Sequence, residues 1–580
     1  MFQRMKLNSS FLRRRLSRQK GIALLMVIFF LGLGATAFLI TSLNKSSDPV
    51  QRDIKANEQL AEAKTALMSY VLSVGTSGGA TRPGDLLLPD ANSETPGNYD
   101  GTSDGGCLNA TQANGLPLIN SGTNMRCLGR FPWQSYRLTI NNFSENDGIG
   151  SMPWYAISAN LVDPLCIGTF NPSIANLTYT TYTCPATATN VTHPWLTVRD
   201  TLGNVLSSRV AAILFMPGPP VGGQSRPVSP NIAGANQYLD SITVLNTCTT
   251  NPHVAGTFNN ADMDNDFIKA DDSRTGANNN PCYGTPYQFN DKLVYITIDE
   301  LIAEATKRAA AEVDSLLTNY NGANGHFPYA APLGASAGNF NSSGTSTSGM
   351  VPIDVTDTCS CSSSTGCSCS FGLVASVTHT RASGGNYTVI SGSCTRSGTS
   401  CTCTGAGSCA NVTYTRHFDC DLAGVCSFTG TGTSPHFIYT LKLPYGNIVT
   451  ASSSCSKSGN NADCTGVGSF TVGLNEVAWF STNLWQNFFY YNWTAAANLQ
   501  IGLTGATGTR QNVRAIIIGT GAPIINAPFA SKGSAQTGVA SATLDDYLDS
   551  TENTDGDIEF DATNKLINSS YNDQVFVISP

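Results

Sequence analysis

The longest apolar stretch of the chain lies near its N-terminus. Residues 21–44 read GIALLMVIFFLGLGATAFLITSLN and carry no charged side chain. As one helix, this stretch would cross a hydrocarbon core of about 30 Å. Residues 1–20 hold seven basic side chains and no acidic one. The positive-inside rule therefore predicts that they stay in the cytoplasm and that the chain beyond Lys45 lies across the membrane.

An amphipathic pattern follows this stretch and ends at the glycine-rich residues 75–79. Its apolar positions recur at three- and four-residue spacing, which predicts a helix with one buried face. They are Leu60, Ala63, Leu67, Tyr70, Val71 and Val74. We therefore expect one long helix over residues 22–74, kinked near Pro49. Its first part, residues 22–44, would be transmembrane, and its second part would pack on a globular head.

The rest of the chain repeats itself in order. IAEATKRAAAEVDSLLTNY, from residue 302, echoes LAEAKTALMSYVLSV, from residue 60. Four later pairs of segments are PWYAISANL with AWFSTNL, RVAAILFMPGPPV with NVRAIIIGTGAPI, YLDS with YLDS, and NDKLVYIT with NDQVFVIS. One such pair can arise by chance, but an ordered series indicates an internal duplication.

Short β-branched runs that end in Gly and Pro, at residues 210–216 and 513–518, predict buried strands. Each copy is therefore expected to be one helix packed against an antiparallel sheet, so the fold class is α+β. A Cys-rich β insertion is also expected within the second copy. Inserted segments lie on protein surfaces and often bind partners. The expected segments are a leader at 1–21, the helix at 22–74, a first repeat at 75–298, a second repeat at 299–580, and a Cys-rich β insertion at 341–475.

The composition narrows the classes of function. Charged residues make up only 12% of the chain, and Gly, Ser, Thr and Asn take their place, which favours strands and turns over long surface helices. Without residues 1–20, the 32 basic residues fall to 25 against 40 acidic ones, a net charge of -15. A body this acidic does not suit nucleic-acid binding. Six histidines leave little material for a histidine-based metal enzyme.

The cysteines fit an oxidising compartment. Six fall in the first copy and twelve in the second, and both even counts are expected if each copy closes its own disulfides. Cys359-x-Cys361 and Cys367-x-Cys369 also match a thiolate metal cluster, but the many neighbouring cysteines favour disulfides. The disulfide candidates are Cys107, Cys127, Cys166, Cys184, Cys248, Cys282, Cys359, Cys361, Cys367, Cys369, Cys394, Cys401, Cys403, Cys409, Cys420, Cys426, Cys455 and Cys464. The spacing does not give their connectivity.

Two acidic loops follow the two YLDS segments. Alternating carboxylates suit Ca²⁺, which takes six to eight oxygen ligands, and solvated acidic loops are the alternative. Both loops fail the full EF-hand pattern; in the first, Phe267 and Ser273 stand where that pattern has Gly and Glu. Ca²⁺ is the one cofactor expected, and its candidate ligands are Asp262, Asp264, Asp266, Asp555, Asp557, Glu559 and Asp561.

The segment Gly334-Ala335-Ser336-Ala337-Gly338 matches the G-x-S-x-G pattern of hydrolases. That pattern needs a strand before it and a helix after it. Here NFNSSGTSTSG follows, which is a loop by composition. We therefore expect no enzymatic activity from this segment, and no other catalytic residue stands out.

The junction Arg18-Gln19-Lys20-Gly21-Ile22-Ala23-Leu24-Leu25 resembles the class III leader of type IV pilins and type II secretion pseudopilins. The resemblance implies that a prepilin peptidase cuts after Gly21 and methylates Ile22, and that the apolar helix then packs against other pilins in a filament. Major pilins carry Glu at the fifth mature position, which here is Met26. In lacking this glutamate, the chain resembles the large minor pseudopilin that is placed at the filament tip.

The wider pattern also looks like a large group of prepilin-type bacterial proteins of unassigned role. RPGDLLLPD, GRFPW, WYAIS and the NDKL segment carry this resemblance. Calcium sites occur in the head domains of pseudopilins, so this resemblance favours Ca²⁺ binding by the acidic loops.

The sequence thus predicts a non-enzymatic minor pilin or pseudopilin. It would be an inner-membrane, single-pass precursor with a periplasmic head, and would then join a pilus or pseudopilus and present the Cys-rich insertion to an unidentified surface or secreted partner. The alternative is a single-pass periplasmic binding or scaffold protein that is never cleaved. The mature N-terminus distinguishes the two.

Overall fold

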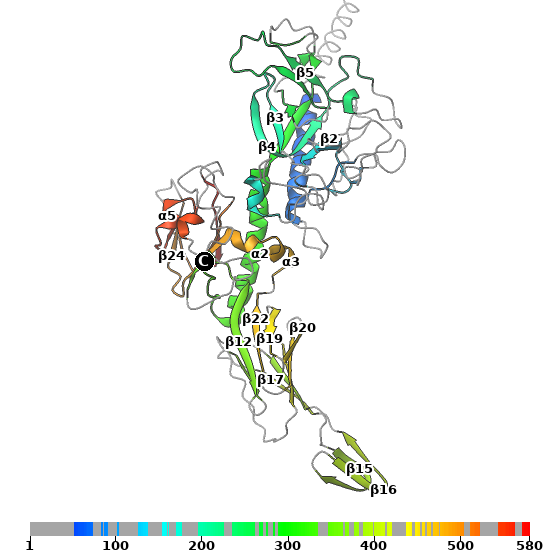
Figure 1. Cartoon of the computed structure of the whole chain (residues 1–580), viewed down its shortest axis with the longest axis vertical. Helices are drawn as coiled ribbons and strands as arrows, with labels where there is room; N and C mark the ends of the chain where they lie inside the picture. The colour runs from blue at the N-terminus through cyan, green and yellow to red at the C-terminus, as the bar shows by residue number, and fades with distance from the viewer. Residues whose placement is uncertain are drawn as a thin grey trace, which may run out of the picture.

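The computed structural model of the chain (Figure 1) describes the following residues: 52–73, 83–84, 86–90, 101–103, 126–136, 153–158, 161, 170–176, 195–225, 235–261, 266–270, 274–275, 282–284, 288–334, 346–362, 366–369, 376–381, 387–397, 400–411, 414–419, 437–442, 447–452, 455–458, 461–465, 468–474, 476–503, 511–521, 543–562 and 571–579.

The first unit is an antiparallel sheet covered by a helix over residues 52–73. Four strands form its centre in the order β1, β2, β4 and β10, with β4 paired to both β2 and β10. β3 extends the sheet beside β4 and pairs in parallel with β7. The strands are β1 (Arg126–Arg130), β2 (Trp154–Ser158), β3 (Leu196–Arg199), β4 (Val205–Met216), β7 (Asp266–Ile268) and β10 (Lys292–Thr297).

The C-terminal half of β4 is buried on both faces, which explains its unbroken apolar run AAILFM. Ala212 and Leu214 belong to the hydrophobic cluster that includes the first helix. Ile213 and Phe215 belong to a second cluster on the opposite face. This alternation follows from the two-residue period of a strand.

The second unit has the same central strands in the same order. β11, β23, β26 and β28 form an antiparallel sheet, and β24 pairs with β25 and, in parallel, with β27. The strands are β11 (Ser348–Met350), β23 (Phe489–Trp493), β24 (Leu499–Leu503), β25 (Gln511–Val513), β26 (Ala515–Gly519), β27 (Glu559–Ala562) and β28 (Gln574–Ser579).

The registers of the two sheets correspond residue by residue. In the first unit Lys292 pairs with Met216 and Trp154 pairs with Phe215. In the second, the matching pairs are Gln574 with Gly519 and Tyr490 with Ile518. The parallel pairs correspond as well, because Asp266 lies opposite Thr197 and Glu559 lies opposite Gln500. The two units therefore share one backbone frame.

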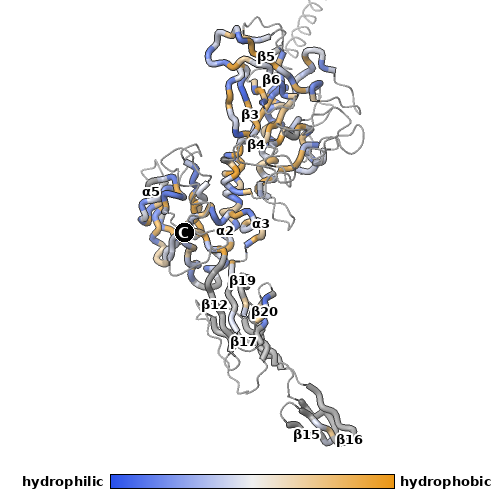
Figure 2. Tube along the Cα trace, viewed as in Figure 1, coloured by the Kyte–Doolittle hydropathy of each residue, from blue (hydrophilic) through white to orange (hydrophobic). Residues whose placement is uncertain are grey.

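α2 (Ile298–Asn324) joins the two units and packs on both of their sheets. Thr297 caps its N-terminus and forms a reciprocal capping box with Glu300, and Gly325, whose φ of 75° lies in the left-handed region, caps its C-terminus. Hydrophobic and hydrophilic positions alternate along it (Figure 2). Its buried residues are Ile298, Leu301, Ile302, Ala305, Thr306, Ala309, Ala310, Val313, Leu317 and Tyr320.

A set of inserted strands lies between β11 and β23. They form a four-stranded sheet, a five-stranded sheet and the separate hairpin β15–β16. In Figure 1 this hairpin lies at the end of the molecule opposite the first helix and β5. The strands are β12 (Asp354–Ser362), β13 (Gly366–Cys369), β14 (Ser376–Arg381), β15 (Tyr387–Ser397), β16 (Ser400–Asn411), β17 (Tyr414–Asp419), β18 (Phe437–Lys442), β19 (Asn447–Ala451), β20 (Cys455–Ser458), β21 (Asn461–Thr465) and β22 (Gly468–Gly473).

Short elements complete the two units. β5 pairs with β6 and β8 pairs with β9 beside the first sheet. The short elements are η3 (Pro172–Asn176), η4 (Ala235–Gln237), β5 (Ser241–Val244), β6 (Gly256–Asn259), β8 (Arg274–Thr275), β9 (Gln288–Phe289), α3 (Ala478–Thr482), η6 (Trp485–Phe488), η7 (Leu544–Asp546) and α5 (Thr551–Thr554).

The fold-class prediction, an α+β chain led by one long N-terminal transmembrane helix, is wrong. Within the described ranges the first helix covers residues 52–73 only, and no helix there has the length and hydropathy needed to cross a membrane. Most of the described elements are strands, as suits a chain rich in Ser, Thr and Gly. The first helix carries exposed Lys55 and Glu58, which suit a helix lying on a head. The apolar residues 22–44 lie outside the described residues.

One of the expected segment pairs is also wrong. The sequence pairs PWYAISANL with AWFSTNL, yet Trp154 lies in β2 whereas Trp479 lies in the short helix α3. Tyr490 in β23 occupies the position of Trp154, as the registers require. The resemblance between the two short segments is coincidental. The true counterpart, in β23, lies shortly after Trp479, and the two strands share only the tyrosines Tyr155 and Tyr491 at matching positions.

Candidate functional site

The junction between the first helix and the head is the candidate functional site, because it joins the N-terminal part of the chain to everything else. An apolar stripe on the helix makes the main contact, and its members are all buried. They are Ala56, Leu60, Ala63, Leu67 and Val71, which share one hydrophobic cluster with α2. Burying one leucine side chain stabilises a protein by roughly 2 kcal/mol, so this stripe dominates the attachment.

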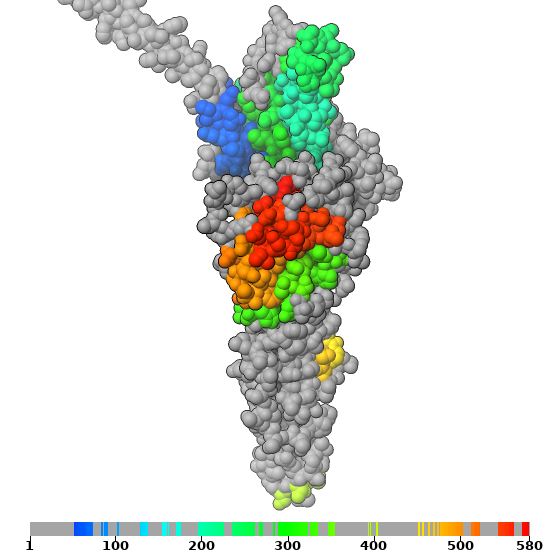
Figure 3. Space-filling model, turned by 90° about the vertical axis from the view of Figure 1, so that its left-hand side faces the viewer, coloured from blue at the N-terminus to red at the C-terminus, as the bar shows by residue number. Residues whose placement is uncertain are grey.

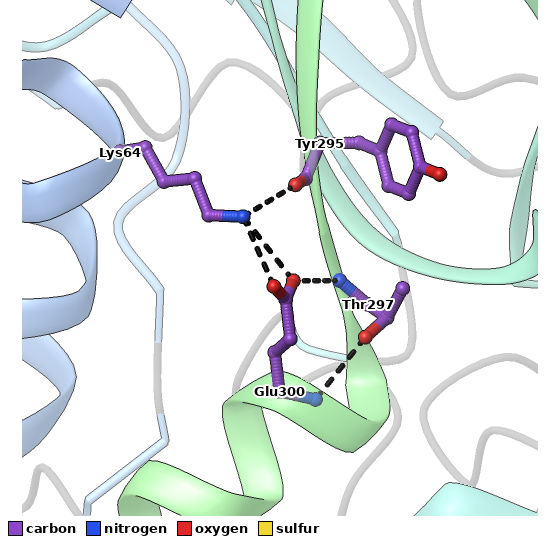
Figure 4. A network of polar contacts seen from close by, with 4 residues as sticks. All are labelled: Lys64, Tyr295, Thr297 and Glu300. Atoms are coloured by element: carbon purple, nitrogen blue, oxygen red, sulfur yellow. Dashed lines mark hydrogen bonds and ion pairs between the residues drawn. The ribbon is translucent and has the colours of Figure 1, made fainter. Parts of the chain in front are cut away.

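Lys64 adds a polar contact at the point where β10 passes into α2 (Figure 4). Its Nζ donates to the backbone oxygen of Tyr295 at 3.0 Å and lies 3.1 Å from Oε1 of Glu300. Glu300 also accepts the backbone N–H of Thr297 at 3.0 Å, while its own N–H donates to Oγ1 of Thr297 at 3.1 Å. The capping box of α2 is therefore tied directly to the first helix.

Two further ion pairs join the first helix, the first sheet and α2. Asp53 on the first helix lies 3.3 Å from Nζ of Lys292 at the start of β10. Arg209 of β4 donates from Nε at 2.9 Å and from Nη2 at 2.7 Å to the two oxygens of Asp299. Asp299 lies in the first turn of α2, where a carboxylate is favoured by the helix dipole. Ion pairs thus join the first helix to β10 and to α2, and join β4 to α2.

A second buried contact joins the two units through Asn483, which follows α3. The Oδ1 atom of Asn483 accepts the backbone N–H of Phe170 at 2.7 Å. Its backbone oxygen accepts Nδ2 of Asn171 at 2.8 Å. Figure 3 shows the orange and red surface of the second unit below the blue surface of the first helix. Nothing in the sequence singled out Asn483.

The two YLDS segments have the same structural role in both units, which we call the Asp clasp. In the first unit, Asp240 accepts the N–H of Asn290 at 2.7 Å, and its own N–H donates to Asp291 at 2.7 Å. In the second unit, Asp549 accepts the N–H of Asn572 at 2.8 Å, and its own N–H donates to Asp573 at 2.6 Å.

In each unit a glycine lies directly against the asparagine of the Asp clasp. A Cβ atom on Gly218 would lie 2.3 Å from Oδ1 of Asn290, and one on Gly521 would lie 2.4 Å from the Asn572 side chain. Such distances leave no room for a side chain. The repeated Asn-Asp dipeptides were visible in the sequence, but their contact with YLDS became apparent only from the folded chain.

The two acidic segments run into corresponding strands: Asp266 is the first residue of β7, and Glu559 and Asp561 lie in β27. Asp262 and Asp264 are outside the described residues, and Asp266 forms an ion pair with Arg199 at 3.1 Å. In the second loop, Oδ1 of Asp555 accepts the N–H of Asp557 at 3.1 Å.

The remaining candidate ligands of the second loop bind the chain itself. Oδ1 of Asp557 accepts the N–H of Glu559 at 2.6 Å, and Oδ2 of Asp561 lies 3.4 Å from Oγ of Ser550. Over the ranges that the structure describes, no group of three or more His, Cys, Asp or Glu side chains is arranged to hold a metal ion. The Ca²⁺ prediction stays a prediction.

One disulfide has both side chains described. Cys248 and Cys282 are bonded and buried beside β5 and β9. Cys403 and Cys455 each take part in a disulfide bond as well. Cys127, Cys359, Cys361, Cys367, Cys369, Cys394, Cys401, Cys409 and Cys464 lie on strands, and Cys107, Cys166, Cys184, Cys420 and Cys426 fall outside the described residues.

Several tyrosines are buried within the two units as neutral groups. Burial raises the pKa of Tyr155 and of Tyr491 well above the ordinary value, and these two residues occupy matching positions. Burial also raises the pKa of Tyr490 to about 12, partly offset by hydrogen bonds with Ser348 and Asn492. Shifts in this direction keep the hydroxyl protonated, so they favour packing over proton transfer.

The sequence-predicted processing residues, Gly21, Ile22 and Met26, lie outside the described residues, as does Ser336 of the G-x-S-x-G segment. Comparison of the chain with protein-family models, with curated proteins and with solved structures gave no match.

Proposed function

We propose that the chain is a non-enzymatic minor subunit of an extracytoplasmic filament, of the type IV pilin or type II secretion pseudopilin kind. In this proposal a prepilin peptidase cuts after Gly21 and methylates Ile22. The apolar residues that follow first hold the protein in the inner membrane and then contact neighbouring subunits. Met26 in place of the usual glutamate favours a sparse position, such as the filament tip, over the repeating shaft.

The observation that carries this proposal is the separation of two regions in Figure 1. The first helix, which continues the N-terminal part of the chain, lies near one end, and the inserted hairpin β15–β16 lies at the other. A subunit that displays a binding region away from its point of attachment needs this arrangement. The apolar stripe and the contacts of Lys64 with Tyr295 and Glu300 support it further, because they would hold the N-terminal part of the chain on the head.

The proposal is tested by fractionating cells that express the full chain together with its native secretion or pilus machinery. The wild type is expected to co-purify with sheared surface filaments or with a membrane-attached pseudopilus. Gly21→Ala is expected to stay in the inner-membrane fraction, because the leader would not be removed. Gly34→Ala, within the same apolar segment, is the matched control and is expected to behave as the wild type.

Two outcomes would contradict the proposal. One is wild-type protein that stays in the inner membrane with its leader attached, which would favour the uncleaved periplasmic scaffold. The other is Gly21→Ala protein that still enters filaments, which would show that processing at this site is irrelevant to assembly.

A further inference from the structure

The inserted strands place cysteines directly opposite one another. In hairpin β15–β16, Cys394 pairs with Cys403, and in hairpin β20–β21, Cys455 pairs with Cys464. Residues directly opposite on antiparallel strands have Cα atoms roughly 4.5–5.5 Å apart. Disulfides are found at Cα separations of about 4.4–6.8 Å, so the backbone of each hairpin is compatible with a cross-strand bond.

Hairpin β12–β13 contains two such pairs. Cys359 lies opposite Cys369, and Cys361 lies opposite Cys367. Residues two apart on a strand share one face of the sheet, so the four cysteines form two successive rungs on the same face.

An independent observation supports two of the four pairs. Cys403 and Cys455 are disulfide-bonded, and the register gives each of them a cysteine as its cross-strand partner. Cys401 and Cys409 share β16 with Cys403, but they lie opposite Arg396 and Val389. The register therefore selects Cys403 among the three cysteines of β16.

The composition of these strands explains why they need covalent links. β13 reads GCSC, β16 reads SCTCTGAGSCAN and β20 reads CSKS. Strands with so few apolar side chains bury little surface, and their pairing register is weakly specified. A bond between opposite residues fixes the register and limits the freedom of the unfolded hairpin.

We propose that the insertion carries a ladder of four cross-strand disulfides, Cys359–Cys369, Cys361–Cys367, Cys394–Cys403 and Cys455–Cys464. Each bond forms when two thiols lose two protons and two electrons to an external protein disulfide, which is reduced to a dithiol in the exchange. The ladder goes beyond the filament proposal, because any exported protein with these hairpins would form it.

The test is disulfide mapping of the full exported chain, alkylated without reduction. Trypsin is expected to release the peptide ending at Lys457 linked to the peptide starting at Ser458, which establishes Cys455–Cys464. Electron-transfer fragmentation then places the partner of Cys394 at Cys403. In the single peptide that ends at Arg381, the same method should find the nested pattern of Cys359 with Cys369 around Cys361 with Cys367.

Several results would overturn the ladder. Linkage of Cys394 to Cys401 would contradict the register of β15–β16, and bonds within Cys359-x-Cys361 would contradict that of β12–β13. Zinc bound at about one ion per chain, with four thiols in β12–β13 that react only after chelation, would replace the two rungs there by a metal site.

A variant supplies a second, independent readout. Cys455→Ser is expected to leave one reactive thiol per chain, located at Cys464 by alkylation and mass spectrometry. Ser456→Ala, on the same strand, is the matched control and should expose none. A new thiol located at any cysteine other than Cys464 would contradict the Cys455–Cys464 pair whether or not the variant remains fully stable.

Discussion

The two units share one frame but differ in what joins their first two strands. In the first unit residues 131–153 connect β1 to β2, whereas in the second residues 351–488 connect β11 to β23. The frame is the same on either side of this connection, including the parallel strand pair and the Asp clasp. The second unit thus accepts a large insertion at a site where the connection in the first unit is much shorter in sequence.

The difference teaches where this frame tolerates change. Closing a longer loop adds only about 0.6 kcal/mol for each doubling of its length, so a connection between two strands can grow at small cost. Positions inside the frame have no such freedom. A Cβ on Gly129 would lie 2.6 Å from the backbone oxygen of Asp90, and one on Gly349, at the matching position, would lie 2.1 Å from that of Ala331.

The largest effect is expected from emptying the matching core positions of the two sheets. Trp154 and Tyr490 are both buried, so Trp154→Ala and Tyr490→Ala should each lower the free energy of unfolding by about 3–5 kcal/mol. Urea unfolding followed by circular dichroism measures the loss. Val205→Ala, at a side chain that is half exposed, is the control and should change stability by less than about 0.5 kcal/mol. A Tyr490→Ala loss below that of the control would mean that the positions do not correspond.

Breaking the Asp clasp in either unit should cost less. Asp240→Ala and Asp549→Ala each leave a buried backbone N–H without its acceptor, an expected loss of about 2–3 kcal/mol. Thermal unfolding of the two variants gives the comparison. Asp557→Ala, which removes a carboxylate from an exposed loop, should leave the transition nearly unchanged. Loss of stability in only one clasp variant would break the equivalence of the two units.

Alkaline pH is expected to weaken both units. Burial raises the pKa of Tyr155 and Tyr491 in the folded chain, whereas in the unfolded chain both ionise near pH 10. Their contribution to stability is therefore complete below about pH 10 and falls above it, by about 1.4 kcal/mol per pH unit for each tyrosine.

Urea midpoints at pH 9, 10 and 11 measure this slope. Tyr490, whose pKa is raised to about 12, offers a matched variant. Between pH 10 and pH 11, Tyr490→Phe should reduce the pH dependence of stability by up to about one proton, and an unchanged slope would show that this hydroxyl is exposed to water.

The smallest effect concerns the contact between Lys64 and Glu300. Both side chains are partly exposed, so Lys64→Met should lower stability by less than about 1 kcal/mol. Because salt screens such pairs, the difference from wild type should shrink in 1 M NaCl. Lys307→Met, which removes an exposed pair within α2, is the control. A loss above about 2 kcal/mol would mean that the ion pair, rather than the apolar stripe, holds the first helix.

The sequence predicts local features more readily than it predicts which distant residues contact one another. The apolar stripe from Leu60 to Val71 depends on three- and four-residue spacings, and Leu60, Ala63, Leu67 and Val71 are buried. The sequence pairs Trp154 with Trp479 because the two segments share a Trp, whereas its counterpart in the folded chain is Tyr490, in a strand with little sequence similarity to β2. The clasps, the Asn483 contact and the cross-strand cysteines depend on tertiary contacts or strand register, which spacing alone does not encode.

The central proposal, a processed filament subunit, is tested most directly at the N-terminus. The measurement is the intact mass and N-terminal sequence of the protein isolated from its native membrane. The proposal predicts a chain that starts at methylated Ile22. A chain that still carries residues 1–21 would contradict it and leave an anchored periplasmic scaffold as the function to pursue.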